Sequence, residues 1–424
     1  MNALDPAFPA LHGRPAQGWL NDPNGCAYVD GVYHVFFQYY PDQPTHRDIH
    51  WGHMTSTDLV RWHQRPIALF PRPGGPDAIG AWSGVVALDG RVPTAFYTGI
   101  AERAEESQVV TAISDRDLLV WKQAETGIVG MPDEPDLSQV RDPFLFTFEG
   151  QQYAIQGAGR TDGTPLILLY RCRTMTDWEY LGPLVEGGSG LAEEYAPCDV
   201  WECPQLFQVD GQWVLMVSLW LQRNGVHRHA GVTYLSGELR PGGAGLVFEP
   251  VGGGRADLGP DFYAPQVMAA TAEEPRTLLW AWSWDASRPE AEVEAAGWAG
   301  VLTYARSLSF RDGVLRSEPV AEVLTLRDGV LFGGTGVYAL PAEERAFEVV
   351  AEGPVELVLV DGDDVRSMVG ITSGRILVDG SLVECFGAEV GVKDVSRTVR
   401  TYPTGTSHFE IRGEGPFAVY RLGL

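Results

Sequence analysis

The stretch Trp19-Leu20-Asn21-Asp22-Pro23-Asn24-Gly25 places one carboxylate, two side-chain amides, a proline and a glycine within seven residues. Taken alone, it predicts a tight turn, because Asn and Asp side chains bond to nearby backbone, Pro fixes φ and Gly tolerates positive φ. A similar junction returns along the chain at a regular interval. That interval, more than the turn itself, predicts the fold.

Short motifs of this kind open an apolar run at five places. Their Pro or Gly residues lie at positions 23, 84, 143, 204 and 265, which are separated by 61, 59, 61 and 61 residues. The five junctions are Asn21-Asp22-Pro23, Trp82-Ser83-Gly84, Arg141-Asp142-Pro143, Glu202-Cys203-Pro204 and Ala264-Pro265. Four of them are followed by an acidic residue and a glycine, which is a hairpin signal between apolar runs. These pairs are Asp30-Gly31, Asp89-Gly90, Glu149-Gly150 and Asp210-Gly211.

Each unit of about 60 residues reads as a meander of three or four strands, with almost no helical periodicity. The 50 Gly and 29 Pro, without low-complexity repeats, agree with many turns and short strands. A sheet of this size cannot bury both faces alone, so five copies predict a ring of stacked sheets, a five-bladed β-propeller. A large sandwich with coincidental turn spacing is the alternative, which four nearly equal intervals disfavour.

The interval of about 60 residues ends near residue 318. We therefore predict an all-β chain with a five-bladed β-propeller over residues 1–318 and a linker over 319–327. Strand-like runs continue over residues 328–424 with denser turns, and they predict a separate C-terminal β-sandwich.

Composition excludes several classes of partner. The net charge of −25 disfavours nucleic acid, whose phosphates need a basic surface, and favours a neutral ligand. No apolar run approaches the roughly 20 residues of a membrane span, so no membrane partner is expected. Five Cys form an odd, sparse set that predicts no disulfide framework. Cys198 and Cys203 lack a second Cys/His pair at ligand spacing, so a metal site at this pair is disfavoured.

No signal peptide is visible at the start of the chain, which predicts a cytoplasmic location for the sequence as given. Secretion of a longer precursor is the alternative. The sequence allows a monomer or a dimer.

In a propeller the first strand of each blade lines the central channel, so the five junctions should converge at one mouth. Three carry carboxylates: Asp22, Asp142 and Glu202. Clustered carboxylates repel one another and shift their own pKa values, which costs stability without a functional return. They could cap strand ends or bind a hard cation. Two carboxylates acting on a glycosidic bond is the stronger interpretation, because the surrounding aromatic and amide side chains suit a sugar.

Together these motifs resemble glycoside hydrolase family 32, the β-fructofuranosidases, which include invertases, sucrose-6-phosphate hydrolases, inulinases and levanases. Trp19–Gly25 is similar to the family's Trp-Met-Asn-Asp-Pro-Asn-Gly signature, with Leu20 in place of Met. The other ordered matches are Phe37-Gln38-Tyr39-Tyr40-Pro41, Trp51-Gly52-His53, Trp82-Ser83-Gly84, Arg141-Asp142-Pro143, Trp201-Glu202-Cys203-Pro204, Asp261-Phe262-Tyr263-Ala264-Pro265-Gln266 and Ser381-Leu382-Val383-Glu384-Cys385-Phe386.

The resemblance implies a role for each carboxylate. Asp22 would be the nucleophile, Glu202 the acid/base, and Asp142 would bind two fructose hydroxyls and stabilise the transition state. The implied fructose subsite consists of Asn21, Gln38, Trp51, Trp82, Ser83, Arg141 and Trp282. The implied reaction is retaining hydrolysis of terminal β-D-fructofuranosides, with sucrose first and fructo-oligosaccharides or fructans next. It would run through a fructosyl-enzyme, with the catalytic carboxyls about 5–5.5 Å apart, and would require no metal and no organic cofactor.

Several departures from the family pattern affect the rim and the acid/base. Many members have Trp-Gly-Asn where this chain has Thr45-His46-Arg47-Asp48, and Gln205 stands where Asp is common. Asp285–Trp298, rich in Ala and Glu, is a candidate rim loop. The alternative functions are fructosyl transfer on the same scaffold, an inverting arabinosidase or xylosidase similar to family 43, and a non-catalytic fructan-binding protein.

Overall fold

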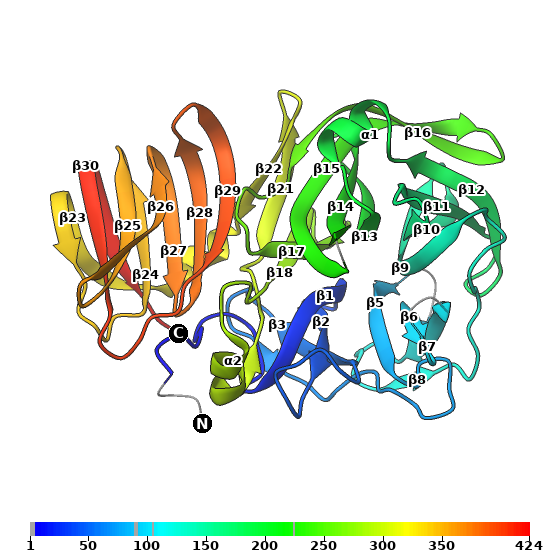
Figure 1. Ribbon diagram of the computed structural model, residues 1–424, viewed down its shortest axis with the longest axis horizontal. Coiled ribbons are helices and arrows are strands. Elements are labelled where there is room, and N and C mark those ends of the chain that lie inside the picture. Colours follow the sequence, from blue (N-terminus) through cyan, green and yellow to red (C-terminus); the bar gives the residue numbers. More distant parts are fainter. Residues whose placement is uncertain (1–4, 89–91, 104–105, 224) are drawn as a thin grey trace.

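Across residues 5–88, 92–103, 106–223 and 225–424, which are those that the computed structural model describes, small antiparallel sheets form a ring beside a layered β unit (Figure 1). This arrangement confirms the predicted all-β class, a five-bladed β-propeller followed by a β-sandwich. The described residues also contain short helices, α1 (Gly190–Tyr195) and α2 (Glu290–Ala296). Helix α2 lies inside the segment Asp285–Trp298, which the sequence predicted as a loop.

Each of the first four blades contains four consecutive strands, with the first strand nearest the channel. Blade 1 contains β1 (Gly18–Val29), β2 (Val32–Tyr40), β3 (His50–Ser56) and β4 (His63–Gln64). Blade 2 contains β5 (Gly80–Ala87), β6 (Thr94–Ile100), β7 (Gln108–Ser114) and β8 (Trp121–Gln123). Blade 3 contains β9 (Leu137–Phe148), β10 (Gln151–Arg160), β11 (Pro165–Cys172) and β12 (Trp178–Glu186). Blade 4 contains β13 (Val200–Val209), β14 (Gln212–Arg223), β15 (Val226–Gly242) and β16 (Gly245–Arg255).

Blade 5 closes the ring against blade 1. It contains β17 (Phe262–Met268), β18 (Leu278–Ser283), β20 (Val301–Leu302), β21 (Arg306–Arg311) and β22 (Val314–Pro319). The intervening β19 (Trp298–Ala299) instead pairs in parallel with β1. Gly300 follows it with φ +74°, and a Cβ there would lie 1.7 Å from the Leu20 carbonyl oxygen. A glycine therefore permits the close approach that joins the two ends of the ring.

The hairpin signals are turns of the predicted kind. Asp30, Glu149 and Asp210 have φ of 49°, and the glycines that follow have φ of 80–84°. Two successive residues with positive φ are the mark of a type I′ turn, whose twist matches that of the flanking strands. The fourth signal, Asp89-Gly90, lies outside the described residues.

The five junctions are β-bulges. In each blade the register between the first and second strand shifts at the junction, for example between Leu20 and Pro23 in blade 1 and between Tyr263 and Gln266 in blade 5. The residues before three of the prolines have positive φ: Asp142 (57°), Cys203 (46°) and Ala264 (46°). A bulge re-aims side chains and bends the strand. The repeated motif therefore turns equivalent side chains toward the same end of the channel.

The C-terminal residues form two layers that share one long strand. The strands are β23 (Arg327–Ala339), β24 (Ala346–Ala351), β25 (Val355–Asp361), β26 (Asp364–Ile371), β27 (Ser373–Asp379), β28 (Leu382–Glu389), β29 (Val392–Arg400) and β30 (His408–Leu422). The first half of β30 pairs with β25 and the second half with β24. A 3-10 helix, η2 (Ala321–Leu326), precedes β23. The boundaries at 318 and 328 stay a prediction.

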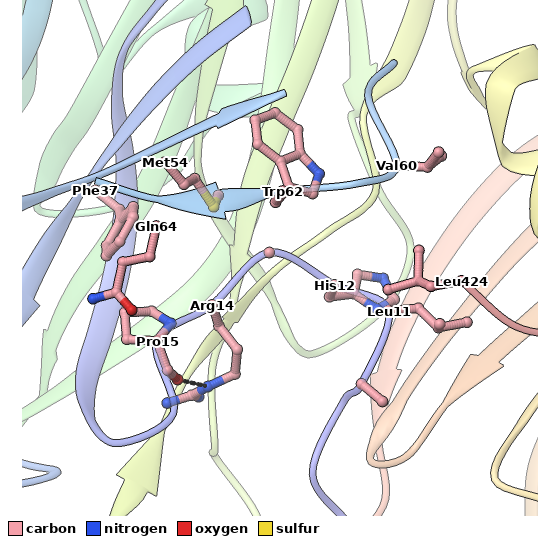
Figure 2. A pocket seen from close by; sticks show the side chains of 12 residues that line it. Leu11, His12, Arg14, Pro15, Phe37, Met54, Val60, Trp62, Gln64 and Leu424 are labelled. Carbon is pink, nitrogen blue, oxygen red and sulfur yellow. Dashed lines mark hydrogen bonds between the residues drawn. The ribbon is translucent and has the colours of Figure 1, made fainter. Parts of the chain in front are cut away.

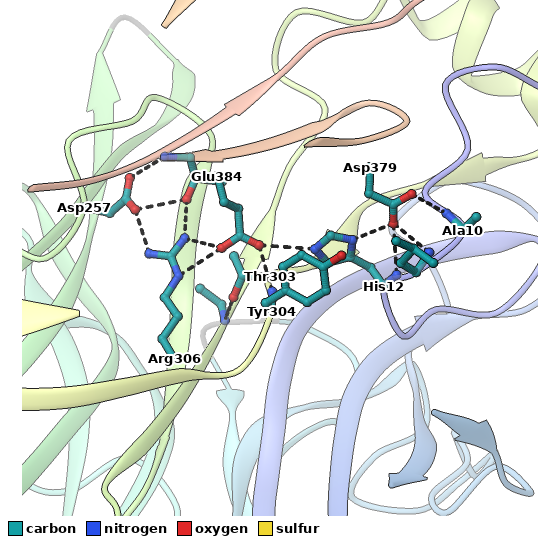
Figure 3. A network of polar contacts seen from close by, with 11 residues as sticks. Ala10, His12, Asp257, Thr303, Tyr304, Arg306, Asp379 and Glu384 are labelled. Carbon is teal, nitrogen blue, oxygen red and sulfur yellow. Dashed lines mark hydrogen bonds and ion pairs between the residues drawn. The ribbon is translucent and has the colours of Figure 1, made fainter. Parts of the chain in front are cut away.

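A buried ionic network joins the two units (Figure 3). Arg306 on β21 is fully buried and donates to Asp257 of the propeller (2.8 Å) and to Glu384 of the sandwich (2.7 Å). His12 lies between Glu384 (Nε2, 3.2 Å) and Asp379 (Nδ1, 2.7 Å). Burial opposes the charge on His12, yet hydrogen bonds to these two carboxylates raise its pKa. Opposite charges thus satisfy each other across the interface.

The N-terminal segment that carries His12 also lines a cavity of about 160 Å³ (Figure 2). The cavity is bounded by Met54 and Trp62 of blade 1 and by the chain end at Leu424. Beside it, the backbone N–H groups of Ala10, Leu11 and His12 donate to the Asp379 carboxylate at 2.7–3.1 Å. The segment therefore attaches the sandwich to the first blade.

Candidate active site

Hydrogen bonds around the channel mouth join residues that are 61 positions apart, which is the period of the repeat. They link Ser83 to Asp22 (2.5 Å), Cys203 to Asp142 (2.9 Å), Arg141 to Glu202 (3.0 Å), Tyr263 to Glu202 (2.7 Å) and Gln266 to Gln205 (3.1 Å). Equivalent positions of neighbouring blades are thus in direct contact. The three carboxylates that the sequence singled out meet at one place.

Asp22 lies at the end of the channel with donors around its carboxylate. Oδ2 accepts bonds from Ser83 Oγ (2.5 Å) and Gln38 Nε2 (3.1 Å), and Oδ1 accepts one from Asn21 Nδ2 (3.0 Å). The indole N–H of Trp19 donates to Asn21 Oδ1 (2.7 Å), which fixes the orientation of that amide. Hydrogen bonds to a carboxylate favour its charged form and hold it in place.

Glu202 is held on both carboxylate oxygens. Arg141 Nε donates to Oε1 (3.0 Å), and the Tyr263 hydroxyl donates to Oε2 (2.7 Å). The Arg141 side chain is 6% exposed, whereas the Glu202 side chain is 15% exposed. Of the two, the glutamate is the group that reaches solvent at the mouth.

Asp142 is buried and lies near both Asp22 and Glu202. Its Oδ2 accepts the Cys203 N–H (2.9 Å), and its own N–H donates to Thr98 Oγ1 (2.8 Å). Burial raises the pKa of Asp142 to about 7; Arg141 opposes the rise, and Glu202 and Asp22 add to it. The two neighbouring carboxylates thus raise the pKa of Asp142 further, because like charges repel one another in a buried site.

The predicted fructose-subsite residues divide into two groups. Asn21, Gln38, Ser83 and Arg141 contact the carboxylates directly, as described above. Trp51 does not reach the mouth: it is fully buried, and its N–H donates to the Trp82 carbonyl (3.0 Å). It supports the backbone of Trp82 from behind.

Aromatic rings surround the mouth. Trp282 packs edge-to-face on Trp19 with ring centres 5.7 Å apart. The His46 ring lies between Trp19 (6.0 Å) and Trp82 (5.6 Å). His229 lies over Tyr263 with ring centres 4.2 Å apart. Burial lowers the pKa of both histidines although Asp22 and Glu202 oppose it, so both rings are neutral near pH 7.

Sequence reasoning did not select His46 or His229, nor the thiol of Cys203, which donates to Asp22 Oδ2 (3.4 Å). His46 lies in the segment that departs from the family pattern, and that departure was its only signal. Gln205, the other departure, is buried, and its Oε1 accepts bonds from the Gln266 side chain and the Val267 N–H. It joins blades 4 and 5 and does not contact Glu202 in the hydrogen bonds of the described residues.

Within the described ranges, no group of three or more His, Cys, Asp or Glu side chains is arranged to hold a metal ion. No helix there is long and apolar enough to cross a membrane.

The sequence model of the glycosyl hydrolases family 32 N-terminal domain matches residues 12–319. The chain belongs to glycosyl hydrolase family 32. The resemblance drawn from the motifs is thereby confirmed, and the matched range ends where β22 ends.

Relatives of this family 32 protein include the raffinose invertase of Escherichia coli, which is 33% identical over 336 residues. The sucrose-6-phosphate hydrolase of Escherichia coli is 31% identical over 329 residues. Each alignment covers 76% of this chain and 66% of the relative. The chain thus spans slightly less than two thirds of the length of these relatives.

Solved structures show the same fold over nearly the whole chain. The family 32 β-fructofuranosidase of Bombyx mori superposes with a TM-score of 0.82 at 24% identity, covering 98% of this chain and 94% of that one. The sucrose-6-phosphate hydrolase of Lactobacillus gasseri gives a TM-score of 0.82 at 22% identity, with coverage of 99% and 93%. At this identity the likeness establishes the fold.

Proposed function

We propose that this protein is a retaining β-fructofuranosidase that hydrolyses terminal β-D-fructofuranosides, with sucrose as the first substrate. The observation that carries the proposal is the pairing of two differently held carboxylates at one channel mouth. Asp22 is buried and surrounded by neutral donors, whereas Glu202 is partly exposed between Arg141 and Tyr263. Two carboxylates in different settings are what a double displacement at a sugar carbon requires.

In the first step, an Asp22 carboxylate oxygen attacks the anomeric carbon of the fructosyl unit. Glu202 gives its proton to the glycosidic oxygen, the bond from the anomeric carbon to that oxygen breaks, and the leaving sugar departs with its hydroxyl restored. The fructosyl unit is then an ester of Asp22. The donors Ser83, Gln38 and Asn21 keep Asp22 aimed at one position before attack.

In the second step, Glu202, now a carboxylate, takes a proton from water. As the proton leaves, the water oxygen attacks the anomeric carbon, and the ester bond to Asp22 breaks. Fructose leaves with its configuration retained, and both carboxyl groups return to their starting states. Asp142 binds two adjacent fructosyl hydroxyls, and its negative charge stabilises the oxocarbenium-like transition state.

The substrate class follows from charge and from the relatives. The net charge of −25 favours a neutral sugar over a phosphorylated one, because a like-charged substrate is repelled. The relatives include enzymes named for raffinose, for sucrose 6-phosphate and for fructan. We place sucrose and raffinose ahead of sucrose 6-phosphate for this chain.

The test uses the purified 424-residue protein with sucrose, raffinose, sucrose 6-phosphate, inulin and an aryl arabinofuranoside. Glucose and fructose release from sucrose is expected, and Asp22→Asn and Glu202→Gln should each lose at least about a thousandfold in kcat, as removal of such groups commonly does. Asp363→Asn, an exposed carboxylate of the sandwich, is the matched control and should keep full activity.

Stereochemistry tests the mechanism separately. With methanol present, the product should be methyl β-D-fructofuranoside by NMR, because two inversions restore the starting configuration. The α anomer would overturn the retaining mechanism. Near-normal turnover by pure Asp22→Asn would overturn the proposed function, and kestose in place of free fructose would assign transfer instead of hydrolysis.

A further inference from the structure

The β14–β15 hairpin of blade 4 is longer than the equivalent hairpins. Its strands contain 12 and 17 residues, whereas β2 and β3 contain 9 and 7, and β6 and β7 contain 7 each. Trp220 and His229 are cross-strand partners in this hairpin. Trp220 also pairs with Val200 at the start of β13, the strand that carries Glu202. The pair therefore lies directly beside the acid/base.

Trp220 packs against Arg141, one of the two residues that donate hydrogen bonds to Glu202. The guanidinium carbon of Arg141 lies 5.6 Å from the centre of the Trp220 ring, within the range of a cation–π contact. The same guanidinium donates from Nε to Glu202 Oε1. His227 stacks on Trp220 with ring centres 4.5 Å apart. The indole thus supports Arg141 at the position where it meets the carboxylate.

His229 packs against Tyr263, the other residue that donates a hydrogen bond to Glu202. Its ring centre lies 4.2 Å from that of Tyr263, whose hydroxyl donates to Glu202 Oε2. The Trp284 ring, 4.7 Å away, packs edge-on against the same imidazole. His229 Nδ1 is buried and has no hydrogen-bond partner among the described residues. Its contacts are therefore those of a packed ring, which favours a role in holding Tyr263 in place.

We propose that the cross-strand pair Trp220–His229 positions Glu202 from both sides, by holding Arg141 and Tyr263 against its two carboxylate oxygens. The inference rests on the proposed function, in which Glu202 is the acid/base. Neither ring touches the carboxylate in the contacts above, so both are positioning residues. Aromatic and cation–π contacts of this kind are strong enough to change how often a side chain leaves its place.

The pH profile of turnover is the readout that a merely structural role would not move. Its basic limb reports loss of the proton that the acid must donate. Arg141 and Tyr263 both donate to the charged form of Glu202, so loosening either should move this limb to higher pH. The other titratable groups acting on Glu202 keep their places in the variants below: Asp142, His46 and the thiols of Cys198 and Cys203. Asp22 shares the mouth and is unchanged in these variants.

The experiment measures kcat and KM for sucrose across pH with His229→Ala and Trp220→Ala. Each should lose about tenfold in kcat, with KM changed less than about threefold and the basic limb about half a pH unit higher, as the weakening of one such contact predicts. His229→Phe and Trp220→Phe keep a ring and should restore most of both values. Val226→Ala, 67% exposed on the same hairpin, is the matched control and should behave as wild type.

Several results would overturn the inference. Ala variants with the wild-type profile would do so, and so would Phe variants as impaired as the Ala variants, since the ring alone would then not account for the effect. If an Ala variant fails to fold, His229→Leu, which keeps apolar volume without a ring, takes its place and must show the same shifted limb. A wild-type protein without turnover on any β-fructofuranoside overturns the proposed function and this inference together. Wild-type turnover that depends on Glu202, with unchanged Ala variants, overturns the inference alone.

Discussion

Replacement of Asp142 by Asn should make the protein more stable at pH 8 while removing its activity. Burial raises the pKa of this carboxyl from its usual 3.8 to about 7, against the opposing effect of Arg141. An ionised Asp142 therefore destabilises the folded protein at neutral and alkaline pH. Asn has the same shape, and its carbonyl oxygen can still accept the Cys203 N–H.

The sign and size of the difference in unfolding free energy follow from the coupling of proton binding to folding. With a folded pKa above the unfolded one, the folded state binds the extra proton between pH 3.8 and about 7, so this group lowers stability as pH rises through that window. The full cost corresponds to roughly 4 kcal/mol and is reached above the folded pKa. Asp142→Asn should therefore exceed wild type by a few kcal/mol at pH 8, and the difference should shrink toward zero near pH 4.5.

Urea unfolding of both proteins, followed by tryptophan fluorescence at pH 4.5, 6 and 8, measures this difference. Glu274→Gln is the control with the opposite behaviour. Hydrogen bonds from Arg276 and Tyr33 lower the pKa of Glu274 to about 2, so its contribution is complete above pH 4.5 and is lost only in stronger acid. That variant should be less stable than wild type by a similar amount at all three pH values. An Asp142→Asn difference that is absent at pH 8, or equal at every pH, would refute the reasoning.

Three further outcomes are expected. Arg306→Met leaves two buried carboxylates without their cation and should cost roughly 3–5 kcal/mol in urea unfolding; a loss below about 1 kcal/mol would contradict the burial of the network. Gly300→Ala places a Cβ 1.7 Å from the Leu20 carbonyl oxygen at φ +74°, so its Tm should fall by several degrees or the protein should not fold, and an unchanged Tm would count against the ring closure. The raised pKa of His12 stabilises the fold below pH 6.5, and this stabilisation is lost as pH rises through the folded pKa; His12→Gln should thus lose more stability at pH 6 than at pH 9, and equal losses would be the contrary result.

The sequence was sufficient to predict the fold because the fold repeats. A bulged junction recurs five times at intervals of 59–61 residues, and an acidic-Gly pair follows four of the five, so the information is local and repeated. The length of the β14–β15 hairpin could not be predicted, because this extension occurs in one blade and has no equivalent in the repeat. Helix α2 has a local signal that the loop prediction overlooked, since Ala and Glu favour helix and Gly297 ends it with φ 73°. The role of Gly300 could not be predicted, because its need for positive φ is visible only when β1 and β19 meet.

At the site, the sequence supplied the side chains of the junctions and, through the family motifs, Gln38 and Trp282, but it missed His46 and His229. Asp22, Asp142 and Glu202 were selected because their junctions are equivalent. His229 and His46 come from a hairpin and a loop outside the repeat, and their placement depends on packing against Tyr263 and Trp82. Trp51 illustrates the opposite case: its motif placed it at the site, whereas blade packing buries it behind Trp82.

The site is built from two consecutive positions of the repeat, namely the two residues that precede the junction Pro or Gly in each of the five blades. The second position supplies Asp22, Ser83, Asp142, Cys203 and Ala264, all buried. The first supplies Asn21, Trp82, Arg141, Glu202 and Tyr263, of which Trp82 and Glu202 are partly exposed. In the proposed mechanism the nucleophile Asp22 must be shielded and aimed, which fits the deeper position, and the acid Glu202 must reach a departing sugar, which fits the position nearer solvent. Two of these side chains are held by the equivalent residues of neighbouring blades: Asp22 by Ser83, and Glu202 by Arg141 and Tyr263. The repeat that builds the ring therefore also builds the support for its chemistry.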